Sequence, residues 1–188
     1  MTIENSKFKK FKGIITMDKK IIGQQKQTTA IDAEELADRM QISDLLSRYF
    51  AAVDDKCIDM KIVKATFASD GKIVRPDGSA IVGWKDILDR QNKSFARFRA
   101  THHVMTDPVI DIKENKAKVR ANLTAMHLWN FNESDPNSLT SHFAAGLVCS
   151  ATAVQTDEGW RIHEMSNRNV WRTGDGLLTM ARDLRPKG

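Results

Sequence analysis

The feature that most constrains the fold is a strict two-residue alternation between positions 116 and 129. The repeating residues are Ala117, Val119, Ala121, Leu123, Ala125, His127 and Trp129, and they are separated by Lys116, Lys118, Arg120, Asn122 and Thr124. Because successive side chains of a strand point to opposite faces of a sheet, the pattern predicts one long strand. One of its faces belongs in a core, and the other is expected to face water or a partner.

Further strands are expected before and after this one. Residues 101–112 read as a strand, and Pro108 indicates a bulge or an edge within it, because proline cannot donate to a ladder. Residues 142–155 are apolar on both faces, which predicts a central strand or a strand at a subunit contact. After a turn at 157–159, residues 160–171 are expected to form the last strand.

The N-terminal half is predicted to be mainly helical. Its first helix begins near Asp32, where acidic residues occupy the first turn, and its periodic apolar face continues to about Val53. The elements expected next are a helix over 58–67, a turn over 68–71, a hairpin with strands 72–75 and 80–82 around a turn at 76–79, and a helix opening at Gly83-Trp84. The inward side chains of that last helix are expected to be Ile87, Leu88, Phe95 and Phe98.

Helices followed by an antiparallel meander predict an α+β fold. We expect a conical, barrel-like roll, in which N-terminal helices pack on a curved, mostly antiparallel sheet and leave a pocket between them. The expected domains are a flexible basic leader over 1–32, one folded domain over 33–172 and a tail over 173–188. Residues 1–30 carry seven lysines against two acidic residues, so the net charge of +5 arises from this segment alone. The charge therefore gives no support for nucleic-acid binding by the domain.

The composition argues against several other classes of protein. The two cysteines, Cys57 and Cys149, have no metal-binding spacing and indicate a reducing compartment. No apolar run approaches the roughly 20 residues of a membrane helix, and the N-terminus lacks the apolar core of a signal peptide. A phosphate-binding loop, a dinucleotide glycine pattern and a nucleophile elbow are all absent from the sequence. We expect a soluble cytoplasmic protein with no metal or organic cofactor, no membrane partner and no nucleic-acid partner.

Candidate catalytic groups stand at two places in the chain. Tyr49 is the only tyrosine, and it falls on the apolar face of the first helix. Asp54 and Asp55 follow where that helix ends, a position at which carboxylates are disfavoured, so they are either simply solvated or used by a site. His102 and His103 are adjacent on a strand, so only one of them can face inward.

These residues carry a resemblance to a known family. The run Tyr49-Phe50-Ala51-Ala52-Val53-Asp54, with Thr101-His102-His103 and Asp107-Pro108-Val109-Ile110-Asp111, resembles the SnoaL-like branch of the nuclear transport factor 2-like superfamily over about residues 33–172. The nearest pattern is that of bile-acid 7α-dehydratases, in which a tyrosine, an aspartate five residues later and a strand histidine line a conical pocket. Scytalone dehydratase and the polyketide cyclases are more distant relatives.

The resemblance implies catalytic roles for Tyr49, Asp54 and His103, where counting back from Pro108 selects His103 over His102. Two positions depart from the dehydratase pattern, since Ala125 replaces a further aspartate and Asn169, next to Arg168, replaces a basic residue. The residues expected to contact substrate are His127, Arg168, Asn169, Leu123 and Trp84.

The implied activity is that of a cofactor-independent acid–base enzyme, a lyase or isomerase of the dehydratase, isomerase or cyclase type. Its substrate would be a hydrophobic, carbonyl-bearing molecule such as a steroid or polyketide. Two alternatives remain open: a non-catalytic ligand-binding or assembly module of the same fold, and the small subunit of a ring-hydroxylating dioxygenase. A homodimer or homotrimer joined through the sheet is also expected.

Overall fold

The computed structural model describes residues 31–75, 78–130 and 134–174. The chain divides into two units, Met1–Asp32 and Ala33–Gly188, and every element described here belongs to the second. In chain order these are α1 (Ala33–Asp54), α2 (Met60–Thr66), β1 (Phe67–Val74), β2 (Ala80–Val82), α3 (Trp84–Phe95), β3 (Phe98–Met105), β4 (Val109–Lys113), β5 (Lys116–Trp129), β6 (His142–Thr156) and β7 (Gly159–Gly174). Residues 1–30 of the predicted leader over 1–32, residues 175–188 of the predicted tail and the turn residues 76–77 lie outside the described residues.

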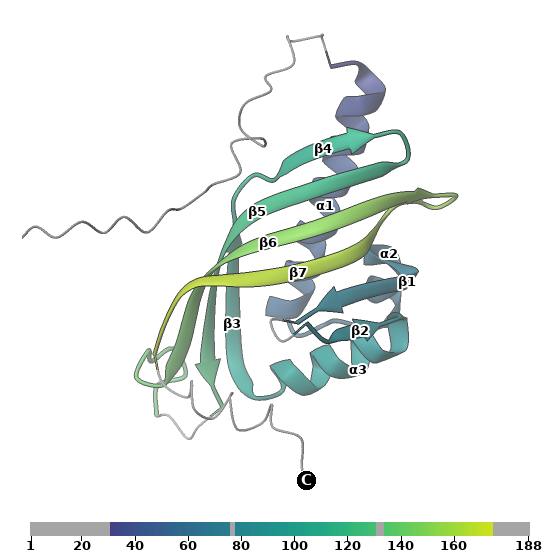
Figure 1. Ribbon diagram of the computed structural model, residues 1–188. Helices are drawn as coiled ribbons and strands as arrows, with labels where there is room; N and C mark the ends of the chain where they lie inside the picture. The colour runs from purple at the N-terminus through teal and green to yellow at the C-terminus, as the bar shows by residue number, and fades with distance from the viewer. Residues whose placement is uncertain (1–30, 76–77, 131–133, 175–188) are drawn as a thin grey trace, which may run out of the picture. The chain divides into compact units, whose positions relative to one another are not determined.

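All seven strands join one sheet in the order β2-β1-β7-β6-β5-β3, and β4 also pairs with β5. Neighbouring strands are antiparallel except β1 and β7, which run parallel with Phe67 opposite Ile162. The sheet is therefore mixed and curled, and it does not close on itself (Figure 1). The expected α+β roll with helices on a curved, mostly antiparallel sheet is confirmed, and the parallel pair is the feature that the meander prediction lacked.

The core lies between the helices and one face of the sheet. Helix α1 crosses behind strands β4 to β7, and α3 lies alongside β1 and β2 (Figure 1). Burial alternates along β5 as predicted, with the odd-numbered residues from Ala117 to Trp129 buried. Strand β6 lies between β5 and β7, which confirms its expected central position.

The first half of the chain departs from the sequence prediction in two places. The expected turn at residues 68–71 is part of β1, which is held by β2 on one side and β7 on the other. Its turn-like composition corresponds instead to a shift in register between Phe67 and Lys72 against β7. The helix expected over 58–67 is shorter, because Asp59 caps α2 through a hydrogen bond from the Ile62 amide and Phe67 already opens β1.

The second half departs in its strand boundaries. Residues 101–112 form two strands, β3 and β4, which pair in turn with the same edge of β5, so the interruption at Pro108 is a true break. Phe98 is buried as expected, but it begins β3 rather than continuing α3. Strand β7 continues to Gly174, beyond the predicted end at Trp171. Within the described residues no helix combines the length and the apolar character needed to cross a membrane.

Candidate active site

The end of helix α1 determines where Asp54 lies. The amide of Cys57 donates to the Ala52 carbonyl and that of Lys56 to the Val53 carbonyl, while Lys56 adopts a φ of 54°. This is the Schellman arrangement that stops a helix with one residue in the left-handed region. The Lys56 ammonium then donates to the Phe98 carbonyl at the start of β3. The carboxylate at the helix end is thereby held against that strand.

Asp54 accepts three hydrogen bonds from β3. The backbone amide of His103 donates to Oδ2 at 2.7 Å, and the Thr101 hydroxyl donates to Oδ1 at 2.7 Å. The ring Nδ1 of His103 lies 2.6 Å from the same Oδ1. Thr101 and His103 are two residues apart on one strand, so both face the same side of the sheet. His102 points the other way and is exposed, and the predicted choice of His103 as the partner of Asp54 agrees with this geometry.

The surrounding groups keep Asp54 ionised. Burial raises the pKa of Asp54, but the hydrogen bonds from the His103 ring, the His103 amide and the Thr101 hydroxyl together bring that pKa below its ordinary value. An ionised carboxylate on Nδ1 favours the tautomer in which Nδ1 carries the proton. Nε2 of His103 then holds an unshared pair, which is the state a general base requires.

Aromatic rings enclose His103, whose side chain is only 5% exposed. Phe50 stacks on it with ring centroids 5.2 Å apart, and Phe95 meets it edge-on at 6.2 Å. His127 also meets it edge-on at 5.3 Å. The space beside the candidate base is therefore filled by rings.

His127 is buried among Phe95, Phe98 and Phe143. Burial, reinforced by the neighbouring His103, lowers the pKa of His127 to about 4. The ring is thus neutral near pH 7 and offers hydrogen bonds rather than charge. Its Nδ1 is one of two buried side-chain polar atoms that have no partner among the described residues, and the other is Oδ1 of Asn167.

Tyr49 lies deeper in the core, 2% exposed, with edge contacts to Phe50 and Phe67 at 5.4 Å each. The ring of Phe50 contacts both Tyr49 and His103 and so links the two predicted catalytic side chains. The side-chain amide of Gln91 donates to the Tyr49 oxygen. Burial raises the pKa of Tyr49, and the Gln91 hydrogen bond opposes this only in part, so the phenol stays protonated.

The other predicted contact residues do not gather at one place, because three lie on the sheet and Trp84 lies on α3. Leu123 is buried in the main core on the face that carries His127. Asn169 pairs with Leu147 of this inner face but is exposed, and Arg168 pairs with Val148, belongs to the outer face and is also exposed. The Trp84 indole donates to the Phe67 carbonyl at 2.8 Å and so anchors α3 to β1.

Ala125 lies directly opposite His103 in the β3–β5 ladder. The position that carries a second aspartate in the dehydratase pattern therefore adjoins the histidine, and here it presents a methyl group. Among the described residues, Asp54 is the carboxylate that contacts His103.

Several residues near the site were not predicted. Thr101 could have been found, because it shares a strand face with His103. Gln91 also had a signal, since it lies four residues after Ile87 and four before Phe95, where the inward stripe of α3 calls for an apolar residue. The sequence gives no signal for Asn167, because the burial of its side chain depends on the pairing of Asn167 with Cys149 between β7 and β6.

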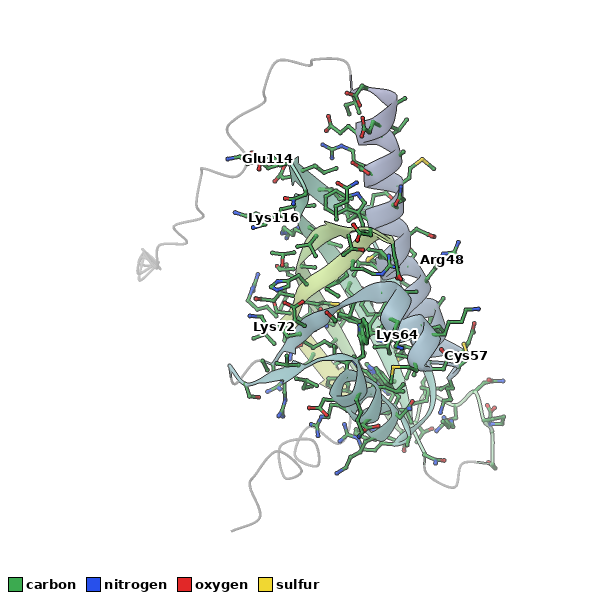
Figure 2. All side chains as sticks on the ribbon, turned by 90° about the vertical axis from the view of Figure 1, so that its right-hand side faces the viewer. Arg48, Cys57, Lys64, Lys72, Glu114 and Lys116 are labelled. Carbon is green, nitrogen blue, oxygen red and sulfur yellow. The ribbon has the colours of Figure 1, made fainter. Side chains whose placement is uncertain are left out.

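Two hollows on the surface of the described residues lie away from these side chains. One is lined by Met60, Lys61, Lys64, Ala65, Glu158 and Arg161, and the other by Arg75, Ala80, Ile81, Asp86, Asp89, Arg90 and Lys93. Figure 2 places Lys64 and Cys57 on the outer side of the helical layer. In the part of the chain that the structure describes, no three His, Cys, Asp or Glu side chains gather as ligands for a metal.

Comparison with known proteins gives a family and a set of structural relatives. The model of the SnoaL-like domain family matches residues 34–166. No curated protein matches the sequence. A solved structure from Kribbella flavida is similar with a TM-score of 0.66 and 23% identity, over 80% of this chain and 99% of that one.

Two further solved structures carry the names of enzymes. A provisionally assigned scytalone dehydratase from Novosphingobium aromaticivorans has a TM-score of 0.64 and 18% identity, over 74% of this chain and 89% of its own. The hexachlorocyclohexane dehydrochlorinase LinA-type3 of Novosphingobium barchaimii has a TM-score of 0.63 and 17% identity, over 77% of this chain and 94% of its own. At these identities the likeness is one of fold.

Proposed function

The chain belongs to the SnoaL-like domain family, and on that premise we propose that it is a cofactor-independent acid–base enzyme of the lyase or isomerase type. The observation that carries the proposal is the contact between Asp54 and His103, a carboxylate on an imidazole inside an aromatic enclosure. A buried pair of this kind has a clear catalytic use, because it fixes one tautomer and leaves the far nitrogen basic.

In the proposed reaction, Nε2 of His103 removes a proton from a carbon next to a carbonyl group. The C–H electron pair forms a carbon–carbon double bond to the carbonyl carbon, the π pair of the carbonyl moves onto its oxygen, and the resulting enolate oxygen accepts a hydrogen bond from the Tyr49 phenol. Collapse of the enolate expels a leaving group on the adjacent carbon, and the His103 imidazolium returns its proton to that group when it is a hydroxyl. Asp54 stays ionised throughout and stabilises the imidazolium.

The surroundings favour a neutral, hydrophobic substrate. The rings of Phe50, Phe95, Phe98 and Phe143 offer apolar contacts, and the neutral His127 offers hydrogen bonds without charge. Such a lining suits a molecule of the steroid or polyketide kind. The names of two structural relatives, a dehydratase and a dehydrochlorinase, describe eliminations and support the lyase class for this chain.

A second candidate function is non-catalytic binding of a similar ligand. The packing of the interior favours it, because the predicted catalytic side chains already have partners. Tyr49 is hydrogen-bonded to Gln91, and the rings of Phe50 and Phe95 contact His103. Under either function the ligand must displace side chains to enter. Phe95 contacts both His103 and His127 and is only partly buried, so it is the ring that we expect to move.

The test begins with a thermal-stability screen of the purified protein against neutral steroids, polyketides and terpenoids that carry a ketone. A ligand at about a hundred times its dissociation constant stabilises by about 2.7 kcal/mol, which is easily measured. Each stabilising compound is then incubated with the protein and assayed for loss of a hydroxyl or shift of a double bond. His103→Ala and Asp54→Asn are compared with His102→Ala, which alters the exposed neighbour on the same strand.

If the protein is an enzyme of this kind, His103→Ala should abolish turnover. The turnover rate of Asp54→Asn should be roughly a hundredfold or more below that of the wild type, and the turnover rate of His102→Ala should be close to it. Circular dichroism of each variant establishes that the fold is retained. Binding without turnover by the wild type, or full turnover by His103→Ala, would reject the enzyme and leave the binding module.

A further inference from the structure

Gln91 occupies an unusual position on α3. The inward stripe of this helix includes Ile87 and Phe95, and Gln91 lies one helical turn from each. A glutamine in such a stripe destabilises the fold unless its side-chain amide is hydrogen-bonded. Its Nε2 donates to the phenol oxygen of Tyr49, which joins α3 to α1 inside the core.

This hydrogen bond has a defined direction. An amide NH₂ group is a donor only, so the phenol oxygen of Tyr49 acts as the acceptor. The phenol proton must then point elsewhere, and Tyr49 makes no other hydrogen bond within the described residues. Edge contacts with Phe50 and Phe67 hold the ring itself in place.

We infer that Gln91 is a positioning residue, which holds the Tyr49 phenol as an acceptor on one side so that its O–H is free to donate to a ligand oxygen. The inference rests on the function proposed above, in which that oxygen is the carbonyl or enolate of the substrate. A glutamate in place of Gln91 would reverse the arrangement. Its carboxylate would accept a hydrogen bond from the Tyr49 hydroxyl, and that hydroxyl could then no longer donate to a ligand.

The protein contains a single tyrosine, so its vibrational spectrum reports on one phenol. The tyrosine Fermi doublet in the Raman spectrum distinguishes a phenol that accepts a hydrogen bond from one that donates. The ligand-free wild type should give the pattern of an acceptor, and Gln91→Glu that of a donor. Asn92→Asp is the matched control, since it makes the same amide-to-acid change at the exposed neighbouring residue and should leave the doublet unchanged.

A donor pattern in the ligand-free wild type, or the same doublet in wild type and Gln91→Glu, would overturn the inference. This part of the test needs no ligand and no turnover. Its outcome is therefore separate from the fate of the proposed function.

The second part uses α-tetralone, a neutral bicyclic aromatic ketone, and tetralin, the matching hydrocarbon without the oxygen. Binding of the ketone to the wild type should move the doublet toward a phenol that both donates and accepts. Gln91→Glu should bind the ketone roughly three- to tenfold more weakly and bind tetralin unchanged, as expected for one hydrogen bond. Equal ketone affinity in wild type and Gln91→Glu would refute the positioning role. If neither probe binds the wild type, the substrate class of the proposed function is rejected, while the ligand-free spectra still decide the role of Gln91.

Discussion

Replacing Asp54 with asparagine should destabilise the protein and reverse the tautomer of His103. The carboxylate accepts from the His103 amide on Oδ2 and from the His103 ring and the Thr101 hydroxyl on Oδ1. Asparagine has one accepting oxygen, so these donors cannot all be satisfied. If that oxygen keeps the backbone amide, the NH₂ group faces Nδ1, which must then lose its proton to accept. The proton moves to Nε2, and the proposed base is lost.

The size of the effect follows from the lost hydrogen bonds. Hydrogen bonds to charged groups contribute about 1.5–3 kcal/mol each, and removing the charge also removes its desolvation cost, so we expect a loss of about 2–3 kcal/mol near neutral pH. The folded pKa of Asp54 is lowered, so its contribution is fully present above the unfolded pKa of about 3.9 and is lost as the pH falls through the folded value. The difference between wild type and variant should therefore shrink in acid.

Urea denaturation followed by circular dichroism, at neutral pH and at several acidic pH values, measures both quantities. Asp55→Asn is the control, because Asp55 is the exposed neighbour in the sequence. Nitrogen NMR of labelled histidine, with His103→Ala for assignment, reports the tautomer directly. If the variant is as stable as Asp55→Asn at every pH and the His103 resonance keeps the Nδ1-protonated form, the account of this site is wrong.

Four further outcomes are expected. Phe95→Ala should cost about 2 kcal/mol in urea denaturation, as a partly buried ring, and should speed ligand binding in stopped-flow measurements; slower binding would show that Phe95 does not block entry. Thiol reagents should modify the exposed Cys57 quickly and the native Cys149 hardly at all, since burial raises the pKa of Cys149 to about 11; comparable rates by mass spectrometry would contradict this. Deleting residues 1–30 should leave the melting temperature and any activity unchanged, and loss of soluble protein would refute it. Trp171→Glu should weaken the proposed homo-oligomer, because Trp171 is 49% exposed on the outer face of the sheet; a monomeric wild type in sedimentation at micromolar concentration would reject the oligomer itself.

Local patterns explain what could be predicted from the sequence. The alternation around Leu123 has a single solution, because a shift of one residue would bury lysines. The side chains of His102 and His103 point in opposite directions because of the pleat of the strand. The contact between His103 and Asp54 then requires only that the end of α1 lie near β3. The roles assigned to these side chains remain proposals.

Long-range pairing explains what could not. The stretch with Asp70 and Gly71 has the composition of a turn, yet it lies within β1, because the residues on either side of it, Phe67 and Lys72, pair with the distant strand β7. The faces of Arg168 and Asn169 depend on register against β6, which local sequence does not fix where a bulge occurs. The filling of the interior by Phe50 and Phe95 likewise depends on how two helices meet β3.

The parallel pairing of β1 with β7 also makes an early strand depend on one that is synthesised much later. One edge of β1 can pair with β2 almost at once, but the other waits for β7, which is the last of these strands in chain order. Contacts between distant segments form slowly, and an incomplete sheet exposes apolar surface in the meantime. A nascent chain whose β7 is still inside the ribosome should therefore bind chaperones, and one whose β7 has emerged should fold without them.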